Sequence, residues 1–299
     1  MKTQEIAPAV ACLPIAFVNV YFVGTRDNWV LIDSGLPHTF KMIQGAASEL
    51  FGDAPPSALL LTHGHFDHSG AARQVVERWN VPIYAHPLEM PYLSARSSYP
   101  PPDPTVGGAI AFMSRFMPAS ADDLSQHLQP LPDDGSVPFL DDWRWIFTPG
   151  HAPGHVSFFR QSDRTLIAGD ALATEDMDKW GGALFKRPQK IARSGTPFVC
   201  DWDKSRQSAQ ELAPLQPRVL ACGHGIPMSG ENVAPQLEDF AANFPIPSHG
   251  RYVQEAAQTD ENGIVSLPTP ALDPLPKIAA GIGATLLAAT LLKRRRRKS

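Results

Sequence analysis

Short apolar runs separated by turn residues recur along the chain, and this pattern is typical of a protein rich in β-strands. Val18–Val23 and Trp29–Ile32 are predicted to pair as two strands joined by a turn at Gly24–Asn28. The same pattern predicts six further strands: Ala58–Leu61, Val81–Ala85, Trp143–Phe147, Val156–Arg160, Thr165–Ala168 and Arg218–Ala221.

Three segments are predicted to be helical instead. They are Ala71–Trp79, for which Ser69 is the expected N-cap, Arg206–Leu215 and Val233–Phe244. Runs of strands interrupted by a few helices indicate β-sheets covered by helices, which is an α/β fold of the α+β kind.

The spacing of these elements predicts one domain over residues 1–244. Residues 87–140 and 171–204 interrupt the strand pattern and lie between conspicuous polar motifs, so each is either a lid over a functional site or an ordinary surface insertion. Residues 245–276 contain six prolines and are predicted to be a linker. An apolar segment and an arginine-rich tail fill residues 277–299.

The N-terminal apolar stretch from Ile6 to Val23 has some features of a signal peptide. Pro8, Pro14 and Asn19 interrupt it, however, and it runs directly into predicted strands, so we expect it to be part of the fold. The three cysteines form no CxxC pair and no disulfide framework, which favours a reducing, cytoplasmic location.

Charge is distributed unevenly along the chain. The net charge is −4, but residues 277–299 hold seven basic residues and no acidic one, so subtracting the seven leaves −11 on the rest. Such an acidic body argues against a nucleic-acid partner, because contacts with phosphates need a basic face. With hydrophobic residues at 43% the chain has enough material for a packed core, and a small-molecule substrate is the expected partner.

The C-terminal segment 278–292 carries no charge and is followed by a basic cluster, Lys293 to Lys298. Fifteen helical residues reach only ~22 Å, whereas a hydrocarbon core is ~30 Å thick. The segment therefore predicts either contact with the membrane interface through anionic lipids or a helix docked on the body. A full span with the body on the other side of the membrane would require export by a route that the sequence does not show.

The strongest chemical signal is the run Thr62-His63-Gly64-His65-Phe66-Asp67-His68, which places four ligand-type side chains in six positions directly after an apolar strand. In an extended chain His63 and His65 point the same way and can grip one metal ion. Asp67 and His68 follow where the chain turns and can face a second ion. Imidazole with carboxylate suits zinc, iron or manganese, and zinc is favoured.

Three other predicted strands each deliver one more residue of this type beside a glycine. His151 follows Trp143–Phe147, Asp170 follows Thr165–Ala168, and His224 follows Arg218–Ala221. Strand ends that converge on one edge of the fold would build a rigid site.

The ordered series HxHxDH, TPGH, AGD and GHG resembles the metallo-β-lactamase superfamily over residues 15–230, and Ile32-Asp33-Ser34-Gly35 resembles its second-strand motif. The resemblance implies a four-layer αββα sandwich of two mixed sheets. It also implies that His63, His65 and His151 bind one metal, that Asp67, His68 and His224 bind a second, and that Asp170 bridges the two. Asp33 would hold the histidine loop by hydrogen bonds.

Within that family the chain looks most similar to the glyoxalase II-like and lactonase-like hydrolases, because the bridging Asp170 is present. His65 stands where the diiron flavoprotein branch carries a glutamate. The resemblance implies a dinuclear metal-dependent hydrolase of ester-like bonds, with Asp67 also passing a proton to the leaving group. The alternative is a mononuclear iron oxidoreductase of the persulfide dioxygenase type on the same scaffold.

Three further residues near these motifs admit two roles each. His155 lies four positions after His151 and is expected to support the site without binding metal. His86 ends a strand and is expected to be structural. Cys222 could be a soft ligand, but a small core residue is the favoured interpretation.

Overall fold

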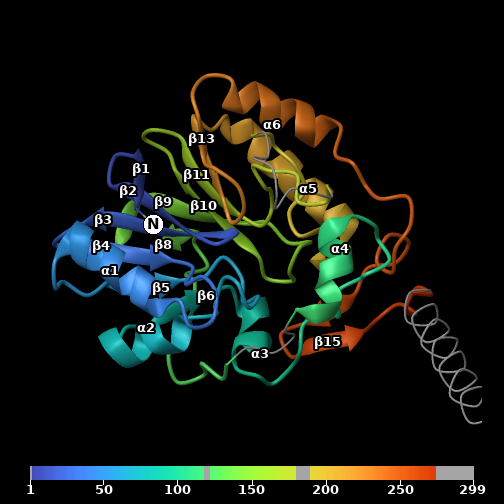
Figure 1. Cartoon of the computed structure of the whole chain (residues 1–299), viewed down its shortest axis with the longest axis horizontal. Helices are drawn as coiled ribbons and strands as arrows, with labels where there is room; N and C mark the ends of the chain where they lie inside the picture. The colour runs from blue at the N-terminus through green and yellow to red at the C-terminus, as the bar shows by residue number, and fades with distance from the viewer. Residues whose placement is uncertain (1, 118–121, 180–188, 274–299) are drawn as a thin grey trace, which may run out of the picture.

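Two mixed β-sheets stack face to face, and helices cover the outer face of each (Figure 1). The computed structural model describes residues 2–117, 122–179 and 189–273. The four layers confirm the αββα sandwich expected from the sequence.

The first sheet has seven strands in sequence order. β1 to β4 are antiparallel and β4 to β7 are parallel. The strands are β1 (Gln4–Ala7), β2 (Val10–Ile15), β3 (Val18–Thr25), β4 (Asn28–Ile32), β5 (Ala58–Leu60), β6 (Ile83–Ala85) and β7 (Leu128–Pro130).

The second sheet has six strands in the order β13-β12-β11-β10-β9-β8, and only the β11–β12 pair is parallel. The strands are β8 (Ser136–Val137), β9 (Leu140–Phe147), β10 (Val156–Arg160), β11 (Thr165–Gly169), β12 (Val219–Cys222) and β13 (Met228–Ser229).

Helices pack on the outer faces of both sheets. α1 (Phe40–Phe51) and α2 (Ala72–Trp79) cover the first sheet, and α5 (Trp202–Leu212) and α6 (Val233–Ala242) cover the second. Two short helices, α3 (Met90–Leu93) and α4 (Ala109–Met113), and four 3-10 turns, Pro87–Glu89, Ser114–Phe116, Thr196–Phe198 and Ala213–Leu215, lie in the connections.

Strand β4 shows why the two sheets share a core. Its side chains alternate, so that Trp29 and Leu31 join the cluster under α1 and α2 while Val30 and Ile32 join the cluster between the sheets. A strand buried on both faces reads as a continuous apolar run, which is what the sequence shows here.

The predicted strands and helices are found within a few residues of their predicted bounds, and the first 15 residues add two further antiparallel strands to the edge of the first sheet. The stretch that resembled a signal peptide forms β2 and β3, and β1 precedes them. Positive φ angles at Ala9 and Ala16 mark the two tight turns between these strands. α1 was not predicted, although Ile43, Ala46, Ala47 and Phe51 are buried at helical spacing.

The expectation that Ser69 caps α2 is wrong. The helix begins after Ala71, and no side chain caps it. Ser69 instead donates its hydroxyl to the carbonyl oxygens of Gly64 and His65. An N-cap must accept a hydrogen bond from the helix, whereas Ser69 acts as a donor that closes the loop before it.

The predicted insertion 87–140 also extends too far, because its last part contains β7 and β8, which are edge strands of the two sheets. These strands are only three and two residues long. Such short strands carry too little alternation to be recognised in a sequence.

Residues 245–273 are not a free linker. They carry the hairpin β14 (Gln258–Asp260) and β15 (Gly263–Ser266), and Tyr252 and Ala257 are buried in the cluster under α5 and α6. The Ala257 N–H donates to the Cys200 carbonyl at 3.0 Å, and the Tyr252 hydroxyl donates to the Pro101 carbonyl at 2.8 Å. Apolar anchors between the prolines therefore dock this segment on the body.

The predicted membrane contact concerns a segment that falls outside the described residues. This segment comprises residues 274–299, that is, the last three residues of the predicted linker together with the apolar and arginine-rich tail. Membrane contact through 278–292 therefore stays a prediction. Among the residues that the structure describes, no helix has the length and apolar character needed to cross a membrane.

Candidate metal centre

Four strand ends bring the seven predicted ligand residues to one edge of the sandwich. The loop after β5 carries four of them, and the segments after β9, β11 and β12 carry one each. Six of the seven are buried and His65 is half-buried. Their potential ligand atoms form three overlapping groups: His63, His65 and His151; His63, His68 and Asp170; Asp67, His68 and His224.

The first group consists of three histidines whose ring nitrogens converge. His63 Nε2 lies 3.0 Å from His65 Nδ1, which lies 2.9 Å from His151 Nε2. Burial, followed by the neighbouring histidines, lowers the pKa of His63 and His65. Burial also lowers the pKa of His151, to about 4, although Asp170 opposes the shift. Neutral imidazoles present lone pairs, which is the form that binds a metal cation.

The group of Asp67, His68 and His224, called the second ligand group from here on, combines two histidines with a carboxylate, whereas the three histidines above are the first ligand group. His224 Nε2 lies 3.6 Å from the Asp67 carboxylate. Burial alone would lower the pKa of His68 and His224, but Asp170 and the other nearby carboxylates outweigh it and raise these pKa values to about 10 and about 9. The carboxylates thus require positive charge at this point, which metal cations would supply.

Asp170 lies between the two groups. Its Oδ1 is 3.4 Å from His68 Nε2, and its Oδ2 is 3.4 Å from His151 Nε2 and 3.1 Å from His224 Nε2. Asp170 Oδ1 and His68 Nε2 are both buried without a hydrogen-bond partner. Orphaned buried polar atoms are costly unless a cation or another partner satisfies them, so these residues fit a metal centre.

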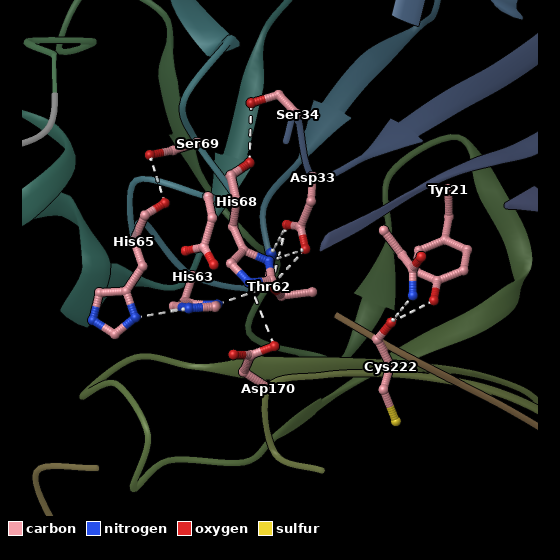
Figure 2. Close-up of polar contacts among 12 residues, drawn as sticks. Tyr21, Asp33, Ser34, Thr62, His63, His65, His68, Ser69, Asp170 and Cys222 are labelled. Atoms are coloured by element: carbon pink, nitrogen blue, oxygen red, sulfur yellow. Dashed lines mark hydrogen bonds and ion pairs between the residues drawn. The ribbon is translucent and has the colours of Figure 1, made fainter. Parts of the chain in front are cut away.

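Hydrogen bonds behind the ligand residues fix their orientation (Figure 2). Asp33 accepts the Thr62 N–H at 2.8 Å and lies 2.8 Å from His68 Nδ1, which leaves His68 Nε2 facing Asp170. His224 Nδ1 lies 2.8 Å from the Phe17 carbonyl oxygen, so Nδ1 carries a hydrogen and Nε2 faces the carboxylates. Support of this kind sets the tautomer of a ligand histidine and raises its basicity.

The remaining sequence candidates lie outside the three groups. His155 Nε2 accepts the Asp170 N–H at 2.8 Å, so it orients the Asp170 backbone. His86 stacks on Phe147 with ring centroids 4.5 Å apart and accepts the Leu88 N–H. Cys222 is buried, and it is its carbonyl oxygen, not its thiol, that takes part in the hydrogen bonds of Tyr21 and Asn19.

One supporting residue was not found in the sequence. The buried Glu89 accepts the Gly64 N–H at 2.9 Å, between His63 and His65, and the Gly154 N–H at 2.7 Å, three residues after His151. It therefore ties together the two loops that carry the first histidine group. Tyr99 donates its hydroxyl to Glu89 and packs its ring 4.4 Å from that of His65.

A close backbone approach makes this arrangement depend on glycine. A Cβ atom at Gly154 would lie 2.8 Å from Glu89 Cγ, and one at Gly64 would lie 2.6 Å from the Tyr99 hydroxyl. Glu89 and Tyr99 lie in a part of the sequence that shows no hydrophobic periodicity. The only indication of their role in the sequence is the glycine beside each histidine motif, which allows another group to approach the backbone closely.

Replacement of Glu89 by Ala is expected to destabilise the protein and weaken metal binding at the first group. The buried Gly154 N–H would lose its acceptor, at a cost of ~1–3 kcal/mol, and the Gly64 N–H would keep only the Tyr99 hydroxyl as an acceptor. Denaturant unfolding and metal titration would measure both effects. The exposed Glu77 of α2 provides the matched control Glu77→Ala. Equal behaviour of the two variants would show that Glu89 does not hold the loops.

A pocket opens beside the candidate ligand residues, and both predicted insertions contribute to it. Ile110 and Met117 come from the first insertion, and Met177, Gly195 and Phe198 come from the second. Described parts of the two segments thus border the site, as the lid interpretation requires.

An αββα sandwich with clustered histidines and aspartates at one edge defines a class of metal-dependent enzymes. The family model described as the metallo-beta-lactamase superfamily matches residues 13–224, and the chain belongs to that superfamily. It is 42% identical over 242 residues to the probable metallo-hydrolase YflN of Bacillus subtilis, covering 79% of this chain and 91% of that protein.

Two more distant proteins are also similar. The hydroxyacylglutathione hydrolase GloC of Haemophilus influenzae is 29% identical over 149 residues, 49% of this chain and 62% of that protein. A solved metallo-beta-lactamase with a HARLDQ motif from Cronobacter sakazakii superimposes with a TM-score of 0.55 at 18% identity, covering 81% of this chain and 91% of that one. At this identity the structural match concerns the fold alone.

Proposed function

We propose that the protein is a dinuclear metal-dependent hydrolase of ester-like bonds, with zinc as the favoured metal and iron or manganese as alternatives. The observation that carries the proposal is the position of Asp170 within 3.4 Å of histidines from both ligand groups. One carboxylate shared by two groups is suited to two adjacent cations. Thioesters and lactones are the proposed substrate types, and the similarity to a hydroxyacylglutathione hydrolase supports the former.

Each described residue of the centre has a defined part in this proposal. His63, His65 and His151 would hold one metal, Asp67, His68 and His224 the other, and Asp170 both. Bound metal ions supply a water whose pKa is lowered toward ~7 and a Lewis acid for the substrate oxygen.

Asp67 has a second role in the proposal. It lines the pocket beside Asp170 and His224, so its carboxyl group can carry a proton to the leaving group. The apolar side chains around the pocket exclude bulk water and strengthen these electrostatic interactions.

The alternative of a mononuclear iron oxidoreductase of the persulfide dioxygenase type is less well supported. It would use one ion and leave most of the second group without a role. That group is buried, and its three ligand-type atoms lie within 4.8 Å of one another. A non-catalytic binding protein is also disfavoured, because no position of the ligand series is lost.

A substrate screen with controlled metal content tests the proposal. The protein would be stripped with a chelator, reloaded with zinc, and assayed on chromogenic thioesters, lactones, carboxylic esters and phosphodiesters. We expect hydrolysis of an ester-like substrate that disappears on stripping and returns on reloading. Hydrolysis that is indifferent to metal, or none on any of these substrates with zinc, iron or manganese, would contradict the proposal.

A further inference from the structure

Apolar side chains form one wall of the pocket beside the metal centre. They are Phe17, Ile110, Met117, Met177 and Phe198, and we define them as the apolar wall. We propose that this wall selects substrates whose acyl group is apolar and uncharged. The inference rests on the proposed function and names the substrate class within it.

The wall is built from three separate parts of the chain. Phe17 lies in the turn between β2 and β3, Ile110 lies on α4, Met117 follows the 3-10 turn after α4, and Met177 and Phe198 belong to the second insertion. Segments this far apart in sequence converge on the site through the fold, so the apolar character is not a consequence of one hydrophobic stretch.

Two wall residues contact the ligand histidines directly. The Phe17 ring stacks on His224 with centroids 6.0 Å apart, and the Phe198 ring lies 5.4 Å from that of His65. A substrate whose reacting carbon lies at the metal centre would therefore place its substituent against these rings.

Charge near the pocket also favours a neutral substrate. Among the described residues that line the pocket, the ionisable groups are histidines and aspartates of the metal centre, and none is lysine or arginine. Several of the described basic residues of the second insertion pair with aspartates outside the metal centre: Arg193 with Asp178 at 3.0 Å, Lys190 with Asp176 at 3.5 Å and Lys179 with Asp176 at 3.8 Å. A carboxylate at the far end of an acyl group would thus meet apolar surface without a described cationic partner, which is costly.

A series of esters with acyl chains of increasing length measures how strongly the apolar wall favours a longer acyl group. With the zinc-loaded full-length protein, kcat/KM for p-nitrophenyl esters from acetate to hexanoate is expected to rise roughly three- to fourfold per methylene, which corresponds to ~0.8 kcal/mol for each buried CH₂. The p-nitrophenyl monoester of adipic acid has the hexanoate chain with a terminal carboxylate. We expect it to react at least tenfold more slowly than the hexanoate.

Two substitutions on one short helix provide a matched pair. Ile110→Arg places a cation in the wall and is expected to raise the adipate-to-hexanoate ratio of kcat/KM at least tenfold. Met113→Arg adds the same charge at an exposed position of α4 that does not line the pocket, and should leave the ratio unchanged. Ile110→Ala, which introduces no charge, should flatten the chain-length series and covers the case in which Ile110→Arg does not fold.

The outcomes separate this inference from the proposed function. If the esters are hydrolysed but the series is flat, or if adipate reacts as fast as hexanoate, the inference is wrong and the hydrolase remains. An equal change of the ratio in Ile110→Arg and Met113→Arg would also overturn it. If no ester, thioester or lactone is hydrolysed in any metal form, the proposed function fails and the inference fails with it.

Discussion

Replacement of His63 by Ala is expected to lower hydrolysis about 10³-fold or more, and replacement of His224 by Ala should have a similar effect. A bound metal ion contributes several kcal/mol of charge stabilisation in the transition state, and ~4 kcal/mol corresponds to ~10³ in rate. His63 belongs to the first ligand group and His224 to the second, so each variant should lose metal from its own group. Steady-state kinetics and elemental analysis would measure the two effects.

The exposed His249 supplies the control for this experiment, because His249→Ala removes an imidazole that belongs to none of the three ligand groups. Circular dichroism should show that all three variants keep the αββα fold. Full activity and full metal content in both His63→Ala and His224→Ala would show that the metal centre is wrongly assigned.

Asp170→Ala is expected to reduce occupancy of both metal positions, whereas His151→Ala should mainly weaken the first. The difference follows from geometry, because the Asp170 carboxylate reaches histidines of both groups and His151 belongs only to the group with His63 and His65. Loss of Asp170 also leaves His68 and His224 without the carboxylate that holds their pKa values high.

Metal titration that resolves two binding events, for example by calorimetry on the stripped protein, would distinguish these variants. We expect both affinities to fall in Asp170→Ala and one to remain near that of the wild type in His151→Ala. Indistinguishable losses in the two variants would mean that Asp170 does not bridge.

The clustering of the candidate ligand residues could be predicted from the sequence because they are few, chemically distinctive and placed at strand ends. The four candidate ligand residues of the run His63–His68 come shortly after β5, and each later one follows a recognisable apolar strand beside a glycine. Parallel and neighbouring strand ends meet at one edge of a sandwich, so local sequence carried information about a long-range arrangement.

Glu89 and the apolar wall could not be predicted in the same way. Glu89 accepts hydrogen bonds from the backbone N–H groups of Gly64 and Gly154. Nearly every residue type has a backbone N–H, so the identity of the donor residue does not show which side chain will accept from it. The wall assembles from ordinary apolar residues in segments without periodicity. Their roles depend on which loops the fold brings together, which composition does not reveal.

The prediction that segment 245–273 is a linker was wrong for a related reason. Its prolines predicted a linker, but the side chains of Tyr252 and Ala257 between them are buried, and Arg251 donates its backbone N–H to the Asp103 carboxylate. Proline restricts the backbone of an extended segment without preventing it from packing. Proline content alone therefore does not distinguish a free linker from a segment that packs against the domain.

The number and identity of the metal ions per chain test the central claim most directly. Elemental analysis of the purified protein, paired with activity during stepwise reloading of the stripped form, would give both values in one experiment. The dinuclear hydrolase predicts two divalent ions per chain, with full hydrolysis only when both are bound. One iron per chain, with dioxygen uptake in place of hydrolysis, would contradict it.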